Sequence, residues 1–278
     1  MLIRGTTDHG RMKSIKDLMD LRGRVALITG GAGKIGSVMA EALAELGARI
    51  VILDLLPESC RRVSDRIAGE YEIETIPLDV DLTCDNEIRR IPERIVDEFH
   101  RLDILIHSAA FVGTSVLPGW VASFEAQSIE TWRKAIDLNL TVPFTLTQAC
   151  VPLLKKTGTA SVINMASIYG ILGPDMRLYD GTGMGNPAAY AASKGGLLQL
   201  TRWLATVLAP EIRVNAITPG GVWREQMEIF VNRYKDRTPL RRMASEEDLK
   251  GAAAYLASDL SAYVTGQNIV IDGGWSVW

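Results

Sequence analysis

Short apolar runs alternate along the chain with longer stretches in which apolar residues recur every three or four positions. The runs lie at 24–29, 49–53, 74–78, 102–107, 160–164, 213–218 and 268–272. Such runs are typical of parallel strands buried on both faces, and the helical spacing between them predicts crossover helices. The pattern therefore predicts an α/β fold: a single domain with one doubly wound parallel sheet of about seven strands and helices on both faces.

Two segments stand apart from this alternation. Residues 1–20 are polar and mixed, and they predict an N-terminal extension to a domain that spans 21–278. The longest helical stretch, 132–154, carries Asn139 among apolar residues and Pro143 near its middle. A buried amide must find hydrogen-bond partners, so Asn139 taken alone is interpreted as structural.

Composition narrows the class of protein. Of 278 residues, 47% are hydrophobic and 23% charged, as in an ordinary globule, and the net charge of -3 gives no reason to expect nucleic acid or a membrane as partner. Scattered Cys60, Cys84 and Cys150 favour a reducing compartment, and no histidine or cysteine motif predicts a metal site. No membrane-spanning run or signal peptide is visible, so a cytoplasmic location is expected.

A glycine-rich turn follows the first strand. The G-x-G-x-x-G motif at 31–36 opens a helical pattern, and the next strand ends in Asp54, 18 residues after Gly36. This is the dinucleotide fingerprint in its required setting, where backbone approaches a pyrophosphate at a helix N-terminus. The Asp54 carboxylate would accept hydrogen bonds from the adenosine ribose and repel a 2′-phosphate, which favours NAD. The Lys34 cation in the loop favours a phosphate, so NADP is the alternative.

Other strands also end in residues suited to this ligand. The third leads into Asp79 and Val80, an expected adenine contact, and the fourth opens into small residues that leave room for a ligand. The predicted cofactor-binding residues are Gly30, Gly33, Lys34, Ile35, Gly36, Asp54, Asp79, Val80, Ser108, Ala109, Ala110, Tyr190, Lys194, Pro219, Gly220 and Val222.

Tyr190 and Lys194 are four residues apart in a helical pattern, so their side chains would share one face of the helix. Such pairs are common by chance on protein surfaces. A positive charge about 5 Å from the phenol, at an effective dielectric of about 20, would contribute roughly 3 kcal/mol and lower the tyrosine pKa by roughly two units. Tyr190 could then exchange a proton with an alcohol oxygen while hydride moves to or from a nicotinamide.

Together these motifs resemble the short-chain dehydrogenase/reductase family, with its Rossmann-type fold, over roughly residues 21–278. The resemblance implies that Ser167 hydrogen-bonds the substrate oxygen and that Tyr190 is the general acid/base. It also implies that Lys194 lowers the pKa of Tyr190 and holds the nicotinamide ribose, while Asn139 supports a water that relays protons to Lys194. The match rests on 29–36, Asp54, Asp79, Val80, Asn139, Ser167, Tyr190, Lys194, 219–221 and 271–274.

Three short motifs depart from the family pattern. Lys34 replaces the usual middle glycine, which gives the T-G-x-x-G-x-x-G loop commoner in longer, nucleotide-sugar-acting members. His107 begins the segment that usually reads N-N-A-G, on the adenosine side of the site. Val222, Trp223 and Arg224 replace a threonine often found after Pro-Gly, in the loop that contacts the nicotinamide.

Two segments are predicted to set substrate specificity. The first, 168–189, is longer than is common in the family, and its Asp175, Arg177 and Tyr179 predict a polar, hydroxyl-rich substrate; a solvated loop is the alternative. The second, 223–245, has a cationic excess. In it Arg224 would anchor a phosphate or carboxylate of the substrate, with a solvated helix face as the alternative.

The preferred interpretation is an NAD-dependent alcohol dehydrogenase or ketoreductase for a sugar-like secondary alcohol or ketone. The glycine loop and the long segment look similar to oxidoreductases of bacterial surface-sugar (nonulosonate-type) biosynthesis. Alternatives are a reductase of 3-oxoacyl or other small keto substrates, a cofactor-retaining sugar epimerase or dehydratase, and a redox-silent NAD-binding protein. The resemblance also implies a homo-oligomer, a tetramer or dimer, formed through two long helices and a C-terminal segment with Trp275 and Trp278.

Overall fold

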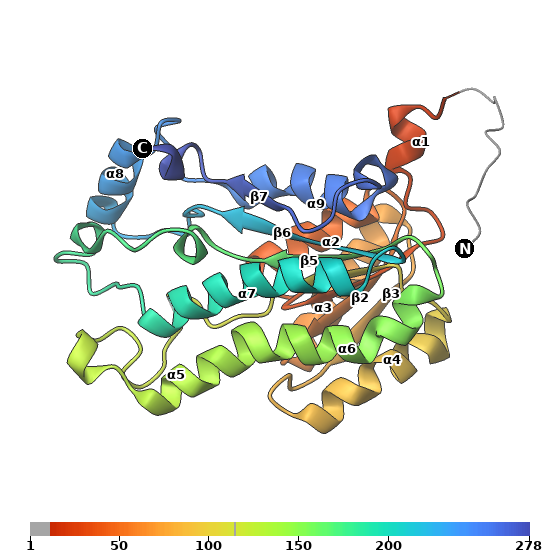
Figure 1. The fold of residues 1–278 in the computed structure, drawn as a ribbon, viewed down its shortest axis with the longest axis horizontal. Coiled ribbons are helices and arrows are strands. Elements are labelled where there is room, and N and C mark those ends of the chain that lie inside the picture. Colours follow the sequence, from red (N-terminus) through yellow and green to blue (C-terminus); the bar gives the residue numbers. More distant parts are fainter. Residues whose placement is uncertain (1–11, 114) are drawn as a thin grey trace.

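The computed structural model describes residues 12–113 and 115–278, and all seven predicted strands form one parallel sheet (Figure 1). The strand order is β3-β2-β1-β4-β5-β6-β7, so the direction of winding reverses between β1 and β4. Ligands bind beyond the carboxyl ends of the strands at such a reversal. The strands are β1 (Val25–Thr29), β2 (Arg49–Asp54), β3 (Thr75–Asp79), β4 (Ile104–His107), β5 (Ala160–Met165), β6 (Ile212–Pro219) and β7 (Asn268–Ile271).

Helices cover both faces of the sheet. Alternate residues of β1 point to opposite faces: Val25 and Leu27 pack with α4, α6 and α7, whereas Ala26 and Ile28 pack with α2, α3 and α9. This burial on both faces explains why the strands are continuous apolar runs. The helices are α1 (Ile15–Met19), α2 (Lys34–Ala44), α3 (Pro57–Tyr71), α4 (Asp85–Phe99), α5 (Ile129–Ile136), α6 (Val142–Lys155), α7 (Ala188–Val207), α8 (Glu228–Arg237) and α9 (Lys250–Ala257).

The long helical stretch expected at 132–154 is confirmed as an unbroken helical run over 129–155, but its middle turn is not α-helical. A single π-helical turn, Asp137–Thr141, joins α5 to α6 and contains Asn139. Pro143 has no N–H to donate to the carbonyl four residues earlier, which weakens the regular α-helical pattern here. Turns of this kind are frequent at functional sites.

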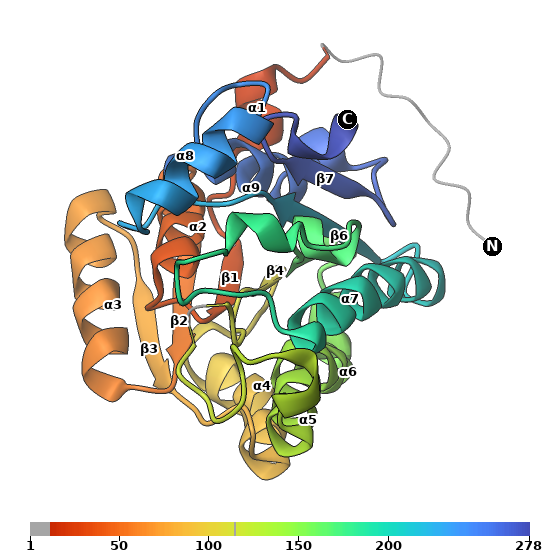
Figure 2. The same cartoon turned by 90° about the vertical axis from the view of Figure 1, so that its left-hand side faces the viewer.

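The predicted substrate loops, 168–189 and 223–245, fold against each other beyond the carboxyl ends of the strands (Figure 2). Arg233 of α8 donates a hydrogen bond of 2.6 Å to the carbonyl oxygen of Asp180 in the first loop. The two loops share an apolar cluster separate from the main cores, made of Ile168, Leu178, Tyr179, Phe230, Val231, Tyr234, Met243 and Trp275.

The C-terminal segment also contributes to this cluster. The Trp275 ring stacks on the Tyr234 ring with centroids 4.3 Å apart, and the side chain is buried within its own chain. The expectation that Trp275 lies at a subunit contact is therefore wrong. Trp278, by contrast, is 71% exposed.

The predicted N-terminal extension lies partly outside the described residues. Within them, α1 begins with a capping box in which Ser14 and Asp17 each accept a hydrogen bond from the other's backbone N–H. In the described part of the chain, no helix is long and apolar enough to cross a membrane. The same residues contain no group of three or more His, Cys, Asp or Glu side chains able to hold a metal ion.

Candidate active site

A cavity of about 530 Å³ opens at the carboxyl ends of the strands and runs from Asp54 to Tyr190. Its wall includes every predicted cofactor-binding residue except Asp79. The Asp79 side chain is exposed, 4.0 Å from Arg94. Successive side chains of an extended chain point to opposite sides, so Val80 faces the cavity and Asp79 does not.

The glycine turn has the shape that a dinucleotide phosphate needs. Gly30 adopts a left-handed φ of +63°, and a Cβ there would lie 2.8 Å from the backbone of Ala109. A Cβ on Gly36 would lie 2.1 Å from the Gly30 carbonyl oxygen. Only glycine allows this approach of α2 to the turn, which leaves the first N–H groups of the helix directed at the cavity. The turn therefore fits a pyrophosphate.

Thr29 fastens this turn to the end of β4. Its Oγ1 accepts hydrogen bonds from the N–H groups of Ser108 and Ala109, at 3.1 and 3.2 Å. His107, the departure from the family motif, points instead into the core, where Nε2 lies 2.9 Å from Oγ1 of Thr147. Burial lowers the pKa of His107 to about 3, so the ring is neutral. Despite the change of motif, Ser108 and Ala109 therefore remain on the cavity wall, held there by Thr29.

Asp54 stands at the adenosine end of the cavity. Its Oδ2 accepts a hydrogen bond of 3.1 Å from the N–H of Ala32, and its Oδ1 accepts one of 2.8 Å from the N–H of Leu55. These bonds fix the carboxylate beside the glycine turn. Each carboxylate oxygen can accept a further hydrogen bond, so ribose hydroxyls can be bound there.

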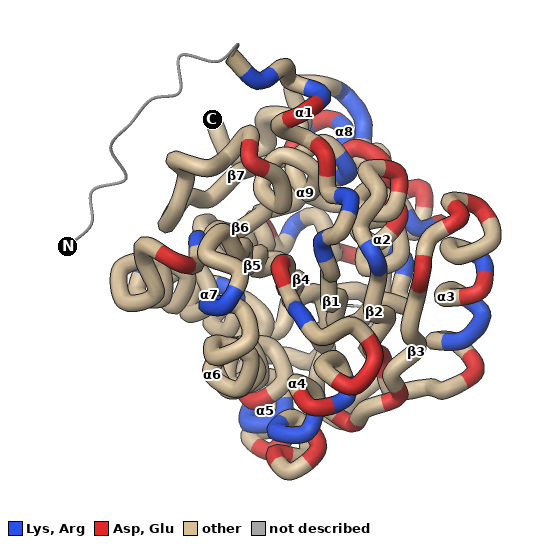
Figure 3. Tube along the Cα trace, turned by 90° about the vertical axis from the view of Figure 1, so that its right-hand side faces the viewer, with Lys and Arg blue, Asp and Glu red and all other residues tan. Residues whose placement is uncertain are grey.

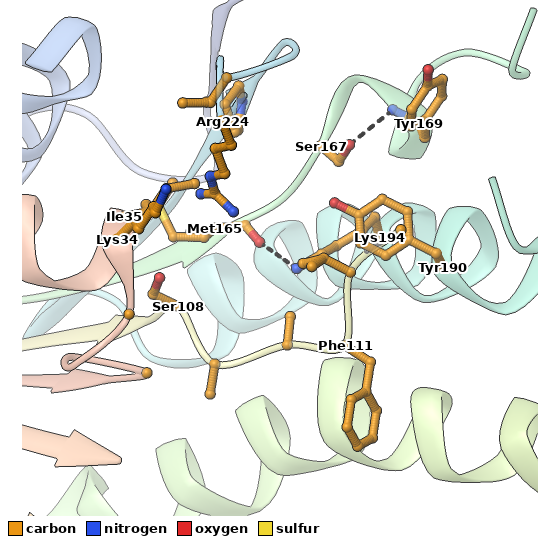
Figure 4. Close-up of a pocket in the computed structure, with 18 of the residues that line it drawn as sticks. Lys34, Ile35, Ser108, Phe111, Met165, Ser167, Tyr169, Tyr190, Lys194 and Arg224 are labelled. Carbon is orange, nitrogen blue, oxygen red and sulfur yellow. Dashed lines mark hydrogen bonds between the residues drawn. The ribbon is translucent and has the colours of Figure 1, made fainter. Parts of the chain in front are cut away.

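The opposite end of the cavity holds Ser167, Tyr190 and Lys194 (Figure 4). The Lys194 Nζ lies 5.9 Å from the centroid of the Tyr190 ring and donates a hydrogen bond of 2.7 Å to the carbonyl oxygen of Met165. The Ser167 hydroxyl is buried and accepts a hydrogen bond of 3.2 Å from the N–H of Tyr169. Ser167 follows β5, and Tyr190 and Lys194 belong to α7. The three side chains therefore line the same end of the cavity.

Burial dominates the acid–base properties of this pair. Desolvation raises the pKa of Tyr190, while the Ser167 hydroxyl lowers it, and desolvation lowers the pKa of Lys194 to about 8. The expected lowering of the Tyr190 pKa by Lys194 is therefore not the prevailing effect in the protein alone. Both charged forms lose water on burial, and this cost exceeds their mutual attraction.

Asn139 lies beneath the cavity and holds two elements together. Its Oδ1 accepts a hydrogen bond of 2.8 Å from the N–H of Phe111, and its Nδ2 donates to the Phe111 carbonyl at 3.0 Å. The same Nδ2 donates to Oγ of Ser193 at 3.1 Å. The π-helical turn thus fixes the loop after β4 against α7, beside Tyr190 and Lys194. The geometry makes Asn139 a positioning residue.

Two of the predicted substrate contacts lie away from the cavity. Asp175 forms ion pairs with Arg177 and Arg237, and hydrogen bonding to Arg177 lowers its pKa to about 2. Neither Asp175 nor Arg177 lines the cavity, so the structure gives no support to this part of the prediction. The two arginines are near enough to neutralise the carboxylate, which therefore joins the loop to α8 instead of facing a ligand.

Sequence reasoning missed two polar residues at this end of the cavity. Tyr169 lines it, with its hydroxyl oxygen 2.6 Å from that of Tyr179, the third predicted substrate contact. Asn186 also lines it, and its Oδ1 is a buried acceptor without a partner among the described residues. Both belong to the long loop, but only its folding over the cavity reveals which side chains face inward.

Comparisons with known proteins agree with this geometry. A family model described as enoyl-(acyl carrier protein) reductase matches residues 30–276. The chain is 32% identical to the probable galactose dehydrogenase GalD of Rhizobium meliloti (strain 1021), over 92% of this chain and 96% of that protein. It is 31% identical to the 3-oxoacyl-(acyl-carrier-protein) reductase FabG of Thermotoga maritima, over 92% and 99% of the two chains.

A solved structure extends the comparison. The gluconate 5-dehydrogenase from Burkholderia cenocepacia J2315, in complex with NADP and tartrate, matches with a TM-score of 0.84 at 28% identity, over 95% of this chain and 100% of that one. The comparisons do not establish the expected similarity to enzymes of surface-sugar biosynthesis. They do confirm the predicted fold and family: the chain belongs to the short-chain dehydrogenase/reductase family and is an oxidoreductase that transfers a hydride between NAD(P) and an alcohol or ketone.

Proposed function

We propose that this protein is an NAD-preferring dehydrogenase or ketoreductase of a polar, sugar-like secondary alcohol or ketone. One observation carries the proposal: a single cavity joins Asp54 at one end to Tyr190, Ser167 and the polar groups of Tyr179 and Asn186 at the other. Hydroxyl and amide groups suit a substrate rich in hydroxyls. The relatives named for galactose and gluconate support a carbohydrate substrate.

The proposed roles follow from the contacts of each side chain. The nicotinamide, when bound, supplies or accepts the hydride. The Tyr190 hydroxyl exchanges a proton with the substrate oxygen, and the Ser167 hydroxyl holds that oxygen in place. Lys194 lines the cavity near Tyr190 and would hold the nicotinamide ribose, as the family resemblance implies. When the amine is protonated, its charge favours the tyrosinate form. Oxidation needs this form because Tyr190 must be deprotonated before it can accept the proton of the alcohol.

The preference for NAD rests on Asp54. Its carboxylate is held beside the glycine turn by two backbone N–H groups, and the next residue, Leu55, is uncharged. A 2′-phosphate there would meet a fixed negative charge. Lys34, exposed at the start of α2, acts in the opposite direction.

The first test measures absorbance of reduced nicotinamide during turnover. NAD and NADP are each tried with sugars, sugar acids, sugar phosphates, simple alcohols and acyl thioesters. We expect NAD-dependent turnover of a hydroxyl-rich substrate, and a loss of at least about a hundredfold in Tyr190→Phe, because that variant lacks the proton donor. Asp54→Asn keeps the shape of the side chain without its charge, and should raise the use of NADP relative to NAD by about tenfold.

Other outcomes of this test would contradict parts of the proposal. Turnover with NADP alone would contradict the role of Asp54. Turnover of acyl thioesters alone would favour the alternative of a 3-oxoacyl reductase, for which the apolar Met184, Phe230 and Met243 on the cavity wall provide a specific structural basis. Full activity of Tyr190→Phe would contradict the catalytic assignment.

We also propose that the protein acts as a homo-oligomer. Helices α6 and α7 lie side by side in Figures 1 and 2, and Figure 3 shows few charged residues along them. Phe144 on α6 and Trp203 and Val207 on α7 are 38%, 53% and 47% exposed. An apolar surface on two adjacent helices supports a subunit contact, as the family resemblance implies.

A further inference from the structure

Arg224 lies on a turn whose backbone is held on both sides. The N–H of Trp223 donates a hydrogen bond of 2.8 Å to the carbonyl of Ala244, and the N–H of Arg224 donates one of 2.7 Å to Oε1 of Gln226. The Nε2 of Gln226 donates in turn to the carbonyl of Val222 at 2.9 Å. The turn therefore determines where the Arg224 side chain begins and in which direction it leaves the backbone.

The guanidinium of Arg224 lacks part of its hydrogen bonding. Its Nε is buried and has no hydrogen-bond partner among the described residues. The same nitrogen lies 3.6 Å from Oε1 of Glu246, which is within ion-pair distance but too long for a hydrogen bond. That nitrogen faces Glu246 and is enclosed, but the Arg224 side chain is 28% exposed and lines the cavity, and its two terminal nitrogens make no hydrogen bond to the described residues. These nitrogens are therefore available to an anionic ligand in the cavity.

The direction of the side chain identifies the region that this anion would occupy. Figure 4 shows Arg224 extending into the cavity on the side of Lys34 and Ile35, while Ser167 and Tyr190 lie across from it. Lys34 is the first residue of α2, where the helix dipole is positive. Two cations and a helix N-terminus therefore face the same space, with Glu246 beside Arg224 offsetting part of the positive charge, and an anion among them is attracted.

We propose that Arg224 binds the diphosphate of the dinucleotide and does not anchor a charged substrate. The inference rests on the proposed NAD(P)-dependent function. A guanidinium can contact two phosphate oxygens at once, and Lys34 and the N–H groups of the glycine turn, which line the same part of the cavity, would hold the diphosphate together with Arg224. The remaining cation on the cavity wall, Lys194, already donates to Met165. The catalytic end of the cavity therefore suits an uncharged substrate.

The test measures binding without turnover. Calorimetric titration with ADP-ribose, which contains the diphosphate, is compared with titration by adenosine, which lacks it. We expect Arg224→Gln to weaken ADP-ribose binding about 10- to 100-fold, because a hydrogen-bonded ion contact is lost, and to leave adenosine binding nearly unchanged. Arg224→Lys should recover part of the affinity. Added salt should weaken ADP-ribose binding more in the wild type than in Arg224→Gln.

Arg241→Ala is the matched control, because Arg241 is an exposed arginine of the same segment that does not line the cavity. It should bind ADP-ribose as the wild type does, and thermal unfolding should show that all variants are folded. Unchanged ADP-ribose binding in Arg224→Gln would overturn the inference, as would an equal loss of adenosine binding. If the wild type binds neither ADP-ribose nor NADH, the proposed function itself fails.

Discussion

At the scale of the residue, Lys194 shows how burial changes the pKa of a charged side chain in the site. The side chain is 4% exposed, and its Nζ has one recorded hydrogen bond, to the Met165 carbonyl. Desolvation lowers its pKa from 10.5 to about 8. A lysine amine in this range changes its protonation state near physiological pH, whereas a free lysine does not. The same burial that prepares the site for proton chemistry therefore reduces the stability of the fold at neutral pH.

Because burial lowers the pKa of Lys194, we predict a stability difference between the wild type and Lys194→Met that depends on pH. Between pH 8 and 10.5 the unfolded chain still holds the lysine proton, whereas the folded chain has released it. The free energy of unfolding of the wild type, relative to that of Lys194→Met, should therefore rise across this range by up to about 3 kcal/mol. Denaturant unfolding at several pH values measures it. A difference that is constant with pH would contradict the prediction, and Lys156→Met, at an exposed position, is the control.

At the scale of the element, the loop 168–189 and α8 act as one unit. The Asp175 side chain is 15% exposed and pairs with Arg237 of α8 and with Arg177 of its own loop. The loop also packs on Phe230 of α8. These contacts hold the loop over the cavity: its charged residues pair with α8 away from the cavity, while its aromatic and amide side chains line the cavity.

Asp175→Ala should make the loop 168–189 more mobile without altering the end of the cavity at Asp54, where the cofactor is proposed to bind. We expect faster proteolytic cleavage within 168–189 and a KM for the substrate raised by about 3- to 10-fold, because the loop loses its ion pairs with α8. Binding of NADH, measured by fluorescence, should not change. Asp180→Ala is a suitable comparison, since Arg233 donates to the backbone carbonyl of Asp180 and the Asp180 residue is exposed. Equal proteolysis of both variants would rule out the proposed role of Asp175.

At the scale of the whole molecule, parallel topology brings the ends of β1, β2, β4, β5 and β6 to one edge of the sheet. Four parts of the site lie at or just after these ends and so line one cavity: the glycine turn, Asp54, Ser108 and Ser167. The opposite end of the sheet, seen in Figure 3, carries both signs of charge on the helices around it. The remaining exposed apolar surface on α6 and α7 suits a subunit contact.

This surface predicts the effect of one substitution on assembly. Trp203→Glu places a charge on the exposed side of α7 and should convert a dimer or tetramer into a smaller species, because an unpaired charge in an apolar contact is costly. Light scattering after size-exclusion chromatography measures the mass. Val96→Glu, on α4, is the control. A monomeric wild-type protein, or an unchanged mass in Trp203→Glu, would argue against this contact.

The sequence by itself determined the seven strands, the glycine turn and the positions of Asp54, Ser167, Tyr190 and Lys194, for which catalytic and cofactor roles are proposed, because these depend on local periodicity and on spacing along one chain. The hydrogen bonds of Asn139, on the π-helical turn, are made to Phe111 and Ser193, which are distant in sequence. Tertiary packing likewise decided that Asp175 pairs with α8. It also turned Arg224 toward Lys34 and placed Tyr169 and Asn186 on the cavity wall. Side-chain direction in a loop is set by what the loop packs against, and that information is absent from local sequence.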